Sequence, residues 1–265
     1  SGTLVLWSAL DRCIWKTAQA VIKNSEFIIG RMYRTFIHAG QVSIRMVSVN
    51  ADNTNDKTVA FAEPNDPLYL MTPSSCPEPF KNDPMFQKFG DRWEIPLEVG
   101  HNDEVHTVWL RFTHAKERAR EADQAGSRPH GRHAAHNTGV SIVRAGRELE
   151  LSQSWVNSDP TERWWGAEID FPPALDEVFG VSNNKQTARY LADAGMLNIK
   201  ILLDGRTVAQ AKEEMIEEGD PLGPILEIAK RITDNLNDIR TLQSRQQKGM
   251  RGNSRKRHLE PDSPE

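Results

Sequence analysis

Two long segments with helical periodicity enclose a middle built of short strand-like segments, and this order limits the chain to the α+β class. Residues 17–38 keep their apolar side chains on one helical face and stop at Gly40. Residues 221–247 carry isoleucine and leucine at steps of three and four, from Ile225 to Leu242. We therefore expect a mixed sheet followed by C-terminal helices.

The first periodic segment is flanked by two strand candidates. Residues 3–7 (TLVLW) form an apolar run suited to a buried strand, and residues 42–49 alternate between apolar and polar side chains. The chain is thus expected to open as strand, long helix, strand. Later strand candidates are residues 59–61, 93–99, 105–113, 140–144, 149–151 and 164–171, with hairpin turns at 100–103 and 145–146.

Composition excludes several classes of protein. The 265 residues are 38% hydrophobic, enough for a sizeable core, and the net charge of −4 is not that of a polyanion-binding chain. Cys13 and Cys76 lie far apart, which argues against a disulfide scaffold or cysteine-rich zinc site and fits a reducing, cytoplasmic compartment. No apolar run reaches the ~20 residues that span a bilayer, so we expect no membrane contact.

Three parts are predicted along the chain after its first ten residues. Residues 11–200 would be an α/β domain, 201–247 a helical extension and 248–265 a disordered basic tail. The nearly heptad pattern in the extension suits either a coiled coil or packing on its own domain. The basic tail suits either nucleic acid or a solubilising role. Because the sequence starts without methionine and inside a strand pattern, we expect a fragment of a longer protein.

Several residues are candidates for a metal site or for catalysis, but a structural or solvent-exposed role is favoured for each. His130, His133 and His136 have a spacing that suits a metal on one helical face, but nearby glycines and a proline favour a variable loop. Glu168 and Asp170 share one strand face, where carboxylates are usually solvated. Asp66-Pro67 is a further candidate carboxylate site, the tryptophans are expected in the core, and Arg144 and Arg147 are expected to lie solvated around a turn.

Taken in order, three regions resemble one family. They are residues 2–7 with 10–12, then 139–147 (GVSIVRAGR), then 163–173 (RWWGAEIDFPP) running on to NNKQ at 183–186. Together they are similar to the region after the ATP lid in GHKL ATPases, the superfamily of gyrase, heat-shock chaperones, histidine kinases and MutL. The similarity is greatest to bacterial histidine-kinase-like or MORC-like members, and it covers roughly residues 2–195.

The resemblance implies a transducer domain, which sends a loop lysine to the γ-phosphate of ATP bound elsewhere. Lys185 takes that place, and Asn183 stands where gyrase-like members have glutamine. It also implies that residues 1–10 are the last strand of a missing nucleotide-binding domain. Mg²⁺, that partner domain, and a homodimer formed on ATP binding are implied as well. The chain itself has no Asp-x-Gly-x-Gly sequence and no Walker-type loop, so alone it should not bind ATP.

Two other functions stay open at this point. One is a non-enzymatic module that binds a protein or nucleic acid through residues 206–247 and the basic tail. The other is a self-contained hydrolase, which is the weakest because no complete catalytic set or Gly-x-Ser-x-Gly elbow is present.

Overall fold

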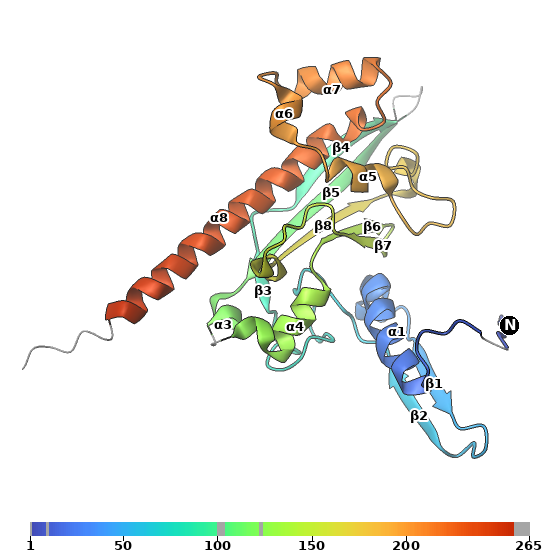
Figure 1. Ribbon diagram of the computed structural model, residues 1–265. Coiled ribbons are helices and arrows are strands. Elements are labelled where there is room, and N and C mark those ends of the chain that lie inside the picture. The colour runs from blue at the N-terminus through green and yellow to red at the C-terminus, as the bar shows by residue number, and fades with distance from the viewer. Residues whose placement is uncertain (1, 9–10, 100–103, 122–123, 257–265) are drawn as a thin grey trace, which may run out of the picture.

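A computed structural model describes residues 2–8, 11–99, 104–121 and 124–256, with side chains described up to residue 246. The chain is an α+β protein with a mixed sheet and C-terminal helices, as predicted (Figure 1). Short 3₁₀ turns at Ala125–Ser127, Pro160–Trp164, Pro173–Leu175 and Gly223–Ile225 join the regular elements.

The main sheet confirms most of the predicted strands. Its members are β3 (Phe86–Lys88), β4 (Trp93–Val99), β5 (Glu104–Ala115), β6 (Val140–Arg144), β7 (Arg147–Ser152) and β8 (Trp165–Phe171). The order is β3-β5-β8-β6-β7, and β4 also pairs with β5. Strands β6 and β8 are parallel and the other pairs are antiparallel. The predicted turn at 100–103 lies outside the described residues.

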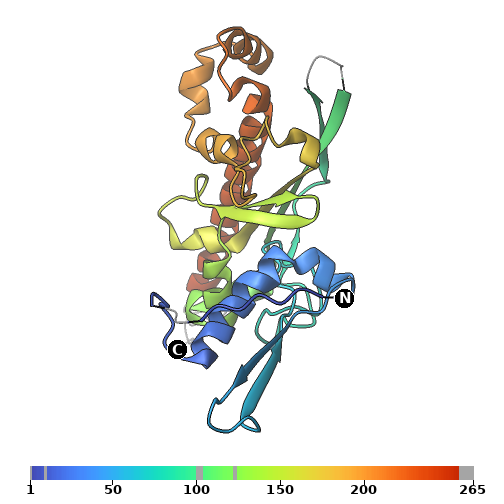
Figure 2. The ribbon, with the colours of Figure 1, turned by 90° about the vertical axis from the view of Figure 1, so that its right-hand side faces the viewer.

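One face of the sheet carries the main core, and helix α8 (Leu226–Lys256) lies across it (Figures 1 and 2). Ile228, Ile232, Leu236 and Ile239 of α8 are at most 1% exposed, because the nearly heptad stripe packs on the chain's own sheet. Helices α5 (Arg189–Ala194), α6 (Ile199–Leu203) and α7 (Val208–Glu217) contribute to the same core. Residues 201–247 therefore do not stand apart from the sheet.

The predicted C-terminal boundary is too early. Helix α8 continues through Lys256, beyond the expected end at residue 247, in a stretch that contains no proline to interrupt it. The remainder of the predicted tail, 257–265, lies outside the described residues.

The N-terminal region projects from the body and departs from the predicted opening. Helices α1 (Ala18–Met32, capped by Thr17) and α2 (Arg34–His38) are followed by β1 (Arg45–Val49) and β2 (Lys57–Phe61), which pair only with each other (Figures 1 and 2). Residues 2–8 have no regular structure. Leu4 is 90% exposed and Trp7 79%, so the predicted strand at 3–7 and the core position of Trp7 are wrong. A strand needs backbone partners, and no described strand pairs with this segment.

A second, smaller core includes Tyr69, Phe80, Phe86, Ala134 and Trp164. It packs against a segment that was predicted to be a loop. The variable loop expected around His130, His133 and His136 is instead helix α4 (Pro129–His136), and the short helix α3 (Glu117–Arg120) precedes it. Pro129 begins a helix without strain because the first helical N–H has no partner in any case. Gly131 is required by packing, since an added Cβ would lie 2.1 Å from the carbonyl oxygen of Ala125. The loop predicted from these two residues is therefore wrong.

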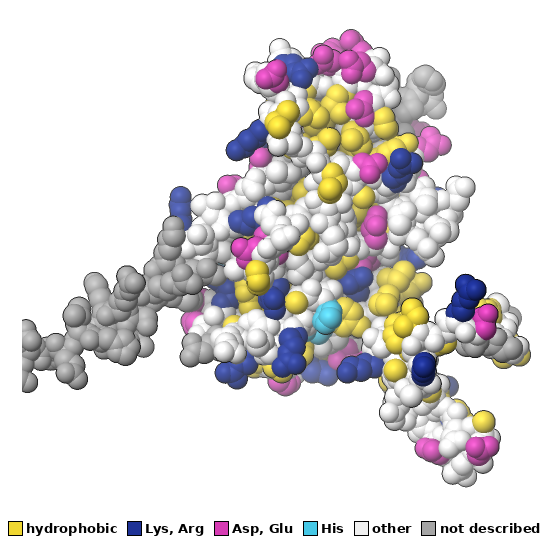
Figure 3. All heavy atoms as spheres, viewed as in Figure 1, with side chains coloured by type: hydrophobic (Ala, Val, Ile, Leu, Met, Phe, Trp, Pro, Cys, Tyr) yellow, Lys and Arg dark blue, Asp and Glu magenta, His cyan; other side chains and the backbone are white. Residues whose placement is uncertain are grey.

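The surface charges are unevenly placed. Asp and Glu side chains gather over α7, at the top of Figure 3, and Lys and Arg side chains are frequent at the opposite end of the body. Within the described residues, every helix is too short or too polar to pass through a bilayer.

Candidate functional site

Lys185 lies in the loop that leads from β8 to α5. The loop is a compact turn in which the Ser182 hydroxyl accepts hydrogen bonds from the backbone N–H groups of Gln186 (3.3 Å) and Thr187 (3.2 Å). Lys185 itself has φ +55°, a left-handed conformation that costs free energy for a residue with a side chain. Asn183 is exposed in the same turn and shares no side-chain hydrogen bond among the described residues. The loop is therefore ordered by its own hydrogen bonds.

The ammonium group of Lys185 is held by a carboxylate that a cation on the sheet also holds. Lys185 Nζ lies 2.7 Å from Asp176 Oδ2. Arg144 donates from Nε to Oδ1 (2.6 Å) and from Nη2 to Oδ2 (2.9 Å) of the same group. These bonds, first those from Arg144 and then that from Lys185, hold the pKa of Asp176 below its usual value, and the pKa of Arg144 is raised. Arg144 is thus not the solvated turn residue that was predicted.

This cluster lies where two parallel strands end. Arg144 is the last residue of β6, its register partner on β8 is Phe171, and Asp176 follows after a short turn. Ligands of sheets with parallel strands commonly bind beyond the carboxyl ends of those strands. The side chains of Arg144, Asp176 and Lys185 are 22%, 18% and 39% exposed, so solvent reaches all three. Pairs exposed to this degree contribute only about 0.2–1 kcal/mol each, and they exchange partners readily.

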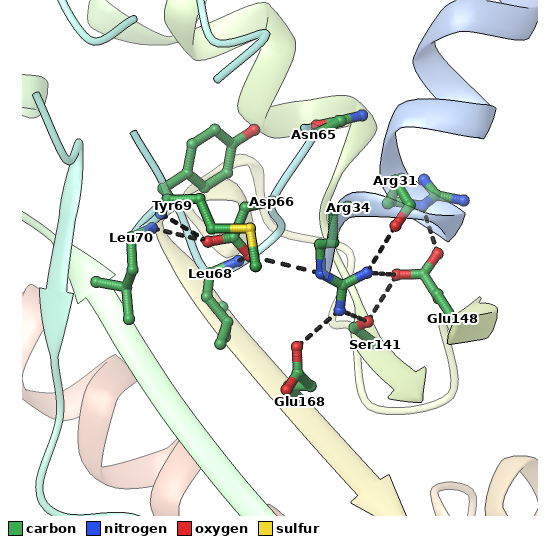
Figure 4. A network of polar contacts seen from close by, with 12 residues as sticks. Arg31, Arg34, Asn65, Asp66, Leu68, Tyr69, Leu70, Ser141, Glu148 and Glu168 are labelled. Carbon is green, nitrogen blue, oxygen red and sulfur yellow. Dashed lines mark hydrogen bonds and ion pairs between the residues drawn. The ribbon is translucent and has the colours of Figure 1, made fainter. Parts of the chain in front are cut away.

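A second polar cluster is buried on the opposite face of the sheet from the main core (Figure 4). Its centre is Arg34 of α2, whose side chain is 1% exposed. Arg34 Nη1 donates to Glu148 Oε2 on β7 (2.8 Å), and Nη2 donates to Glu168 Oε2 on β8 (2.7 Å). The Ser141 hydroxyl on β6 accepts from Nη2 at 2.7 Å. One arginine therefore joins the N-terminal helices to three strands.

The charges of this cluster balance, and we call it the Arg34 network. Arg31 binds Glu148 (2.6 Å) and Arg111 Nε binds Glu168 (3.0 Å). Asp66 lies 3.7 Å from Arg34 Nε, and its carboxylate accepts the backbone N–H groups of residues 68, 70 and 71. Three guanidinium groups thus face three carboxylates. The contacts of Asp66 are those of a structural anchor for residues 66–71.

The ionisation of the network follows from its pairing. Burial alone would lower the pKa of Arg34, but the carboxylates of Glu168 and Glu148 raise it above its usual value. Burial alone would likewise raise the pKa of Glu168, but Arg34 and Arg111 bring it below the usual range. Arg34 and Glu168 are therefore both charged at neutral pH. Glu168 is 3% exposed, so the prediction that it is solvated is wrong.

Asp170 shares the strand face of Glu168 but has a different ionisation. Burial, and then the charge of Glu168, raise its pKa from 3.8 to about 6. A raised carboxyl pKa makes the contribution of this group to stability largest below pH 3.8, and that contribution is lost as the pH rises through 6.

Asp170→Asn is therefore expected to leave stability unchanged at pH 4 and to raise the free energy of unfolding by about 1–2 kcal/mol at pH 8, allowing for partial exposure. Urea unfolding at the two pH values measures the difference. The exposed neighbour variant Glu177→Gln should show no such pH-dependent gain. An Asp170→Asn gain that is equal at both pH values would contradict the assigned cause.

Two of the three histidines, His130 and His133, make polar contacts that fix α4, and His136 packs its ring against Phe27. His133 Nδ1 lies 2.8 Å from the Tyr69 hydroxyl and Nε2 lies 3.3 Å from the Ser75 hydroxyl, and burial lowers its pKa to about 4. His130 Nε2 lies 3.1 Å from the carbonyl oxygen of Ala119. These ring nitrogens contact protein groups that fix the helix. Within the described residues, no three His, Cys, Asp or Glu side chains are grouped as metal ligands.

The expected binding partners can be placed only in part. Lys185 and Arg144 have the charge and exposure that suit a terminal phosphate. Within the described residues, no group of three His, Cys, Asp or Glu side chains is placed to bind Mg²⁺. The nucleic-acid hypothesis rests on basic residues of which all but Arg245 lie beyond the described side chains.

Sequence reasoning points to Lys185 and misses the residues around it. Asp176 lies in the segment that resembles the family but has no predicted role, and Arg34 enters only as part of a helical pattern. The one available signal for the Arg34 network is the pair of acids at 168 and 170 inside an otherwise apolar strand. Comparison with protein-family models, with curated proteins and with solved structures found no match to this chain.

Proposed function

We propose that this chain is the transducer portion of an ATP-dependent GHKL-type protein, in which Lys185 senses the γ-phosphate. The observation that carries the proposal is the position of Lys185 on a loop beyond the ends of β6 and β8. Among the described residues, Asp176 is the one ion-pair partner of its ammonium group, and that pair is partly exposed. An ammonium group in this state can transfer to a phosphate presented by another domain. Bound MgATP supplies the phosphate group that is cleaved.

The contacts of the loop support a role in coupling. The backbone N–H of Ala188, just after the loop, donates to Glu150 on β7 (2.8 Å). Arg144 joins the loop to β6, and the same strand carries Ser141 of the Arg34 network. A change at Lys185 therefore acts directly on two strands that hold α1 and α2. Release of the lysine after hydrolysis would alter these contacts, as in switch loops that lose a phosphate partner.

The N-terminal region supports contact with another domain or subunit. Large apolar side chains that are at least two-fifths exposed concentrate in the first 61 residues: Leu4, Val5, Leu6, Trp7, Ile14, Ile28, Val42, Val47, Val49, Val59 and Phe61. Exposed apolar groups on this scale are typical of interaction surfaces. A nucleotide-binding domain, and the homodimer formed on ATP binding, would bury such a surface. We place this protein in the cytoplasm, where ATP is supplied.

Lys185→Ala is expected to reduce ATP hydrolysis about a hundredfold when the chain is joined to a GHKL-type nucleotide-binding domain, because a positioned charge at the reacting phosphate is lost. Steady-state phosphate release measures the effect. Lys200→Ala, an exposed lysine on α6, is the matched control and should retain full activity. Turnover of Lys185→Ala equal to that control would remove Lys185 from the mechanism.

A further inference from the structure

The carboxylate of Asp176 occupies the position at which two cations converge. Its Oδ2 atom accepts from both Lys185 Nζ and Arg144 Nη2, and Oδ1 accepts from Arg144 Nε. The three side chains come from separate segments: a strand end, the turn after β8 and the loop before α5. With two positive groups and one negative group, the cluster carries a net charge of +1. Its geometry is that of two donors around one small anionic group.

Carboxylate and phosphate groups are both bound by arginine and lysine donors of this kind. An arginine guanidinium binds either group through two parallel N–H donors, and a lysine ammonium follows whichever anion is nearer. Phosphate carries more charge and more acceptor oxygens than carboxylate, so it competes well for a partly exposed lysine. Asp176 is part of the chain and can bind the two cations at any time, whereas a phosphate binds them only while it is present in solution or on a bound nucleotide.

We propose that Arg144 and Lys185 together form a site for a terminal phosphate, and that the Asp176 carboxylate occupies this site until phosphate displaces it from both cations. The proposal rests on the proposed function, and it adds Arg144 as a second phosphate-binding cation and Asp176 as the internal competitor. Arg144 keeps its position on β6 and orients the phosphate, and Lys185 changes partner. The left-handed backbone at Lys185 favours a change of loop conformation once the contact with Asp176 is lost.

The exchange can be tested on this chain with an amine-reactive reagent and inorganic tripolyphosphate as the probe. Labelling of individual lysines is followed by mass spectrometry. Asp176→Asn keeps the side-chain shape and removes the charge, so Lys185 should label several-fold faster than in the unmodified chain. Tripolyphosphate should protect Lys185 in both proteins, and at roughly tenfold lower concentration in Asp176→Asn. Lys200 is the internal control and should change in neither protein.

Arg144→Gln separates the two cations. It should raise the tripolyphosphate concentration needed to protect Lys185 by at least tenfold, because the second donor is lost. The proposal is overturned if Lys185 labels at the same rate in Asp176→Asn as in the unmodified chain. It is also overturned if Arg144→Gln leaves the protection of Lys185 by tripolyphosphate unchanged. Unfolding midpoints in urea establish that each variant is folded. If Asp176→Asn fails to fold, the absence of protection in the unmodified chain still overturns the proposal.

The outcome is distinguishable from failure of the proposed function. A chain that shows the exchange while Lys185→Ala leaves ATP hydrolysis unchanged has this phosphate site without the ATPase role. Loss of hydrolysis in Lys185→Ala, combined with unchanged labelling in Asp176→Asn, supports ATP sensing and overturns the role of Asp176.

Discussion

Arg34→Met is expected to lower the free energy of unfolding by about 3–5 kcal/mol, because the three buried carboxylates of the Arg34 network would then face only two cations. Glu148 and Glu168 are 1% and 3% exposed, and both accept hydrogen bonds from Arg34. Methionine fills part of the volume but donates nothing to either carboxylate. Urea unfolding followed by tryptophan fluorescence measures the loss.

Two further variants decide whether the charge or the packing of Arg34 matters. Arg31→Met is the matched control, because the Arg31 side chain is 16% exposed and pairs with Glu148, which retains Arg34 and Ser141. We expect it to lower the free energy of unfolding by about 1–2 kcal/mol. Adding Glu148→Gln and Glu168→Gln to Arg34→Met removes the two carboxylate charges that Arg34 bound directly and should recover part of the stability. A loss below about 1 kcal/mol for Arg34→Met, or no recovery, would show that the Arg34 network does not hold α2 to the sheet.

The strands and their hairpins are accessible from the sequence because their signals are local. Alternating apolar residues and a turn predict β4 with β5, and β6 with β7, without knowledge of the rest of the chain. The helical period of α8 likewise identifies the buried stripe, although periodicity alone cannot tell a coiled coil from packing on the sheet. That choice depends on which surfaces the fold leaves open, which is a tertiary property.

The polar sites are harder to predict for the same reason. Arg34 and Glu168 are 134 positions apart, and no local pattern marks an arginine that will be buried. Lone strand carboxylates are usually solvated, whereas α2 covers Glu168 and supplies its countercharge. In α4, proline and glycine suggest a loop. In the structure, Pro129 begins the helix and Gly131 allows the helix to pack closely against the backbone of residues 125 and 126. Lys185 is found only through a family resemblance, which gives a position and not the partner Asp176.

Leu236→Ala is the second change for which we expect a large effect, a loss of about 2–5 kcal/mol in the free energy of unfolding. Leu236 lies in the middle of the inner stripe of α8 and is fully buried in the main core. Truncation leaves a cavity between helix and sheet that neither rigid element can close. Asp238→Ala is the matched control on the exposed side of the same turn, and it should change stability by less than about 0.5 kcal/mol.

The same variant tests how α8 is joined to the sheet. Besides its apolar stripe, α8 is anchored by Arg240, which donates to both carboxylate oxygens of Glu162 (2.9 and 2.7 Å), and by Gln243, which donates to the carbonyl oxygen of Trp164 (2.8 Å). If stripe and anchors form one cooperative unit, Leu236→Ala should shift the circular-dichroism and tryptophan-fluorescence transitions together. Loss of helix signal at lower urea than the fluorescence change would show that α8 detaches separately. In that case a change at the ends of β6 and β8 could not be carried to α8 through a rigid contact.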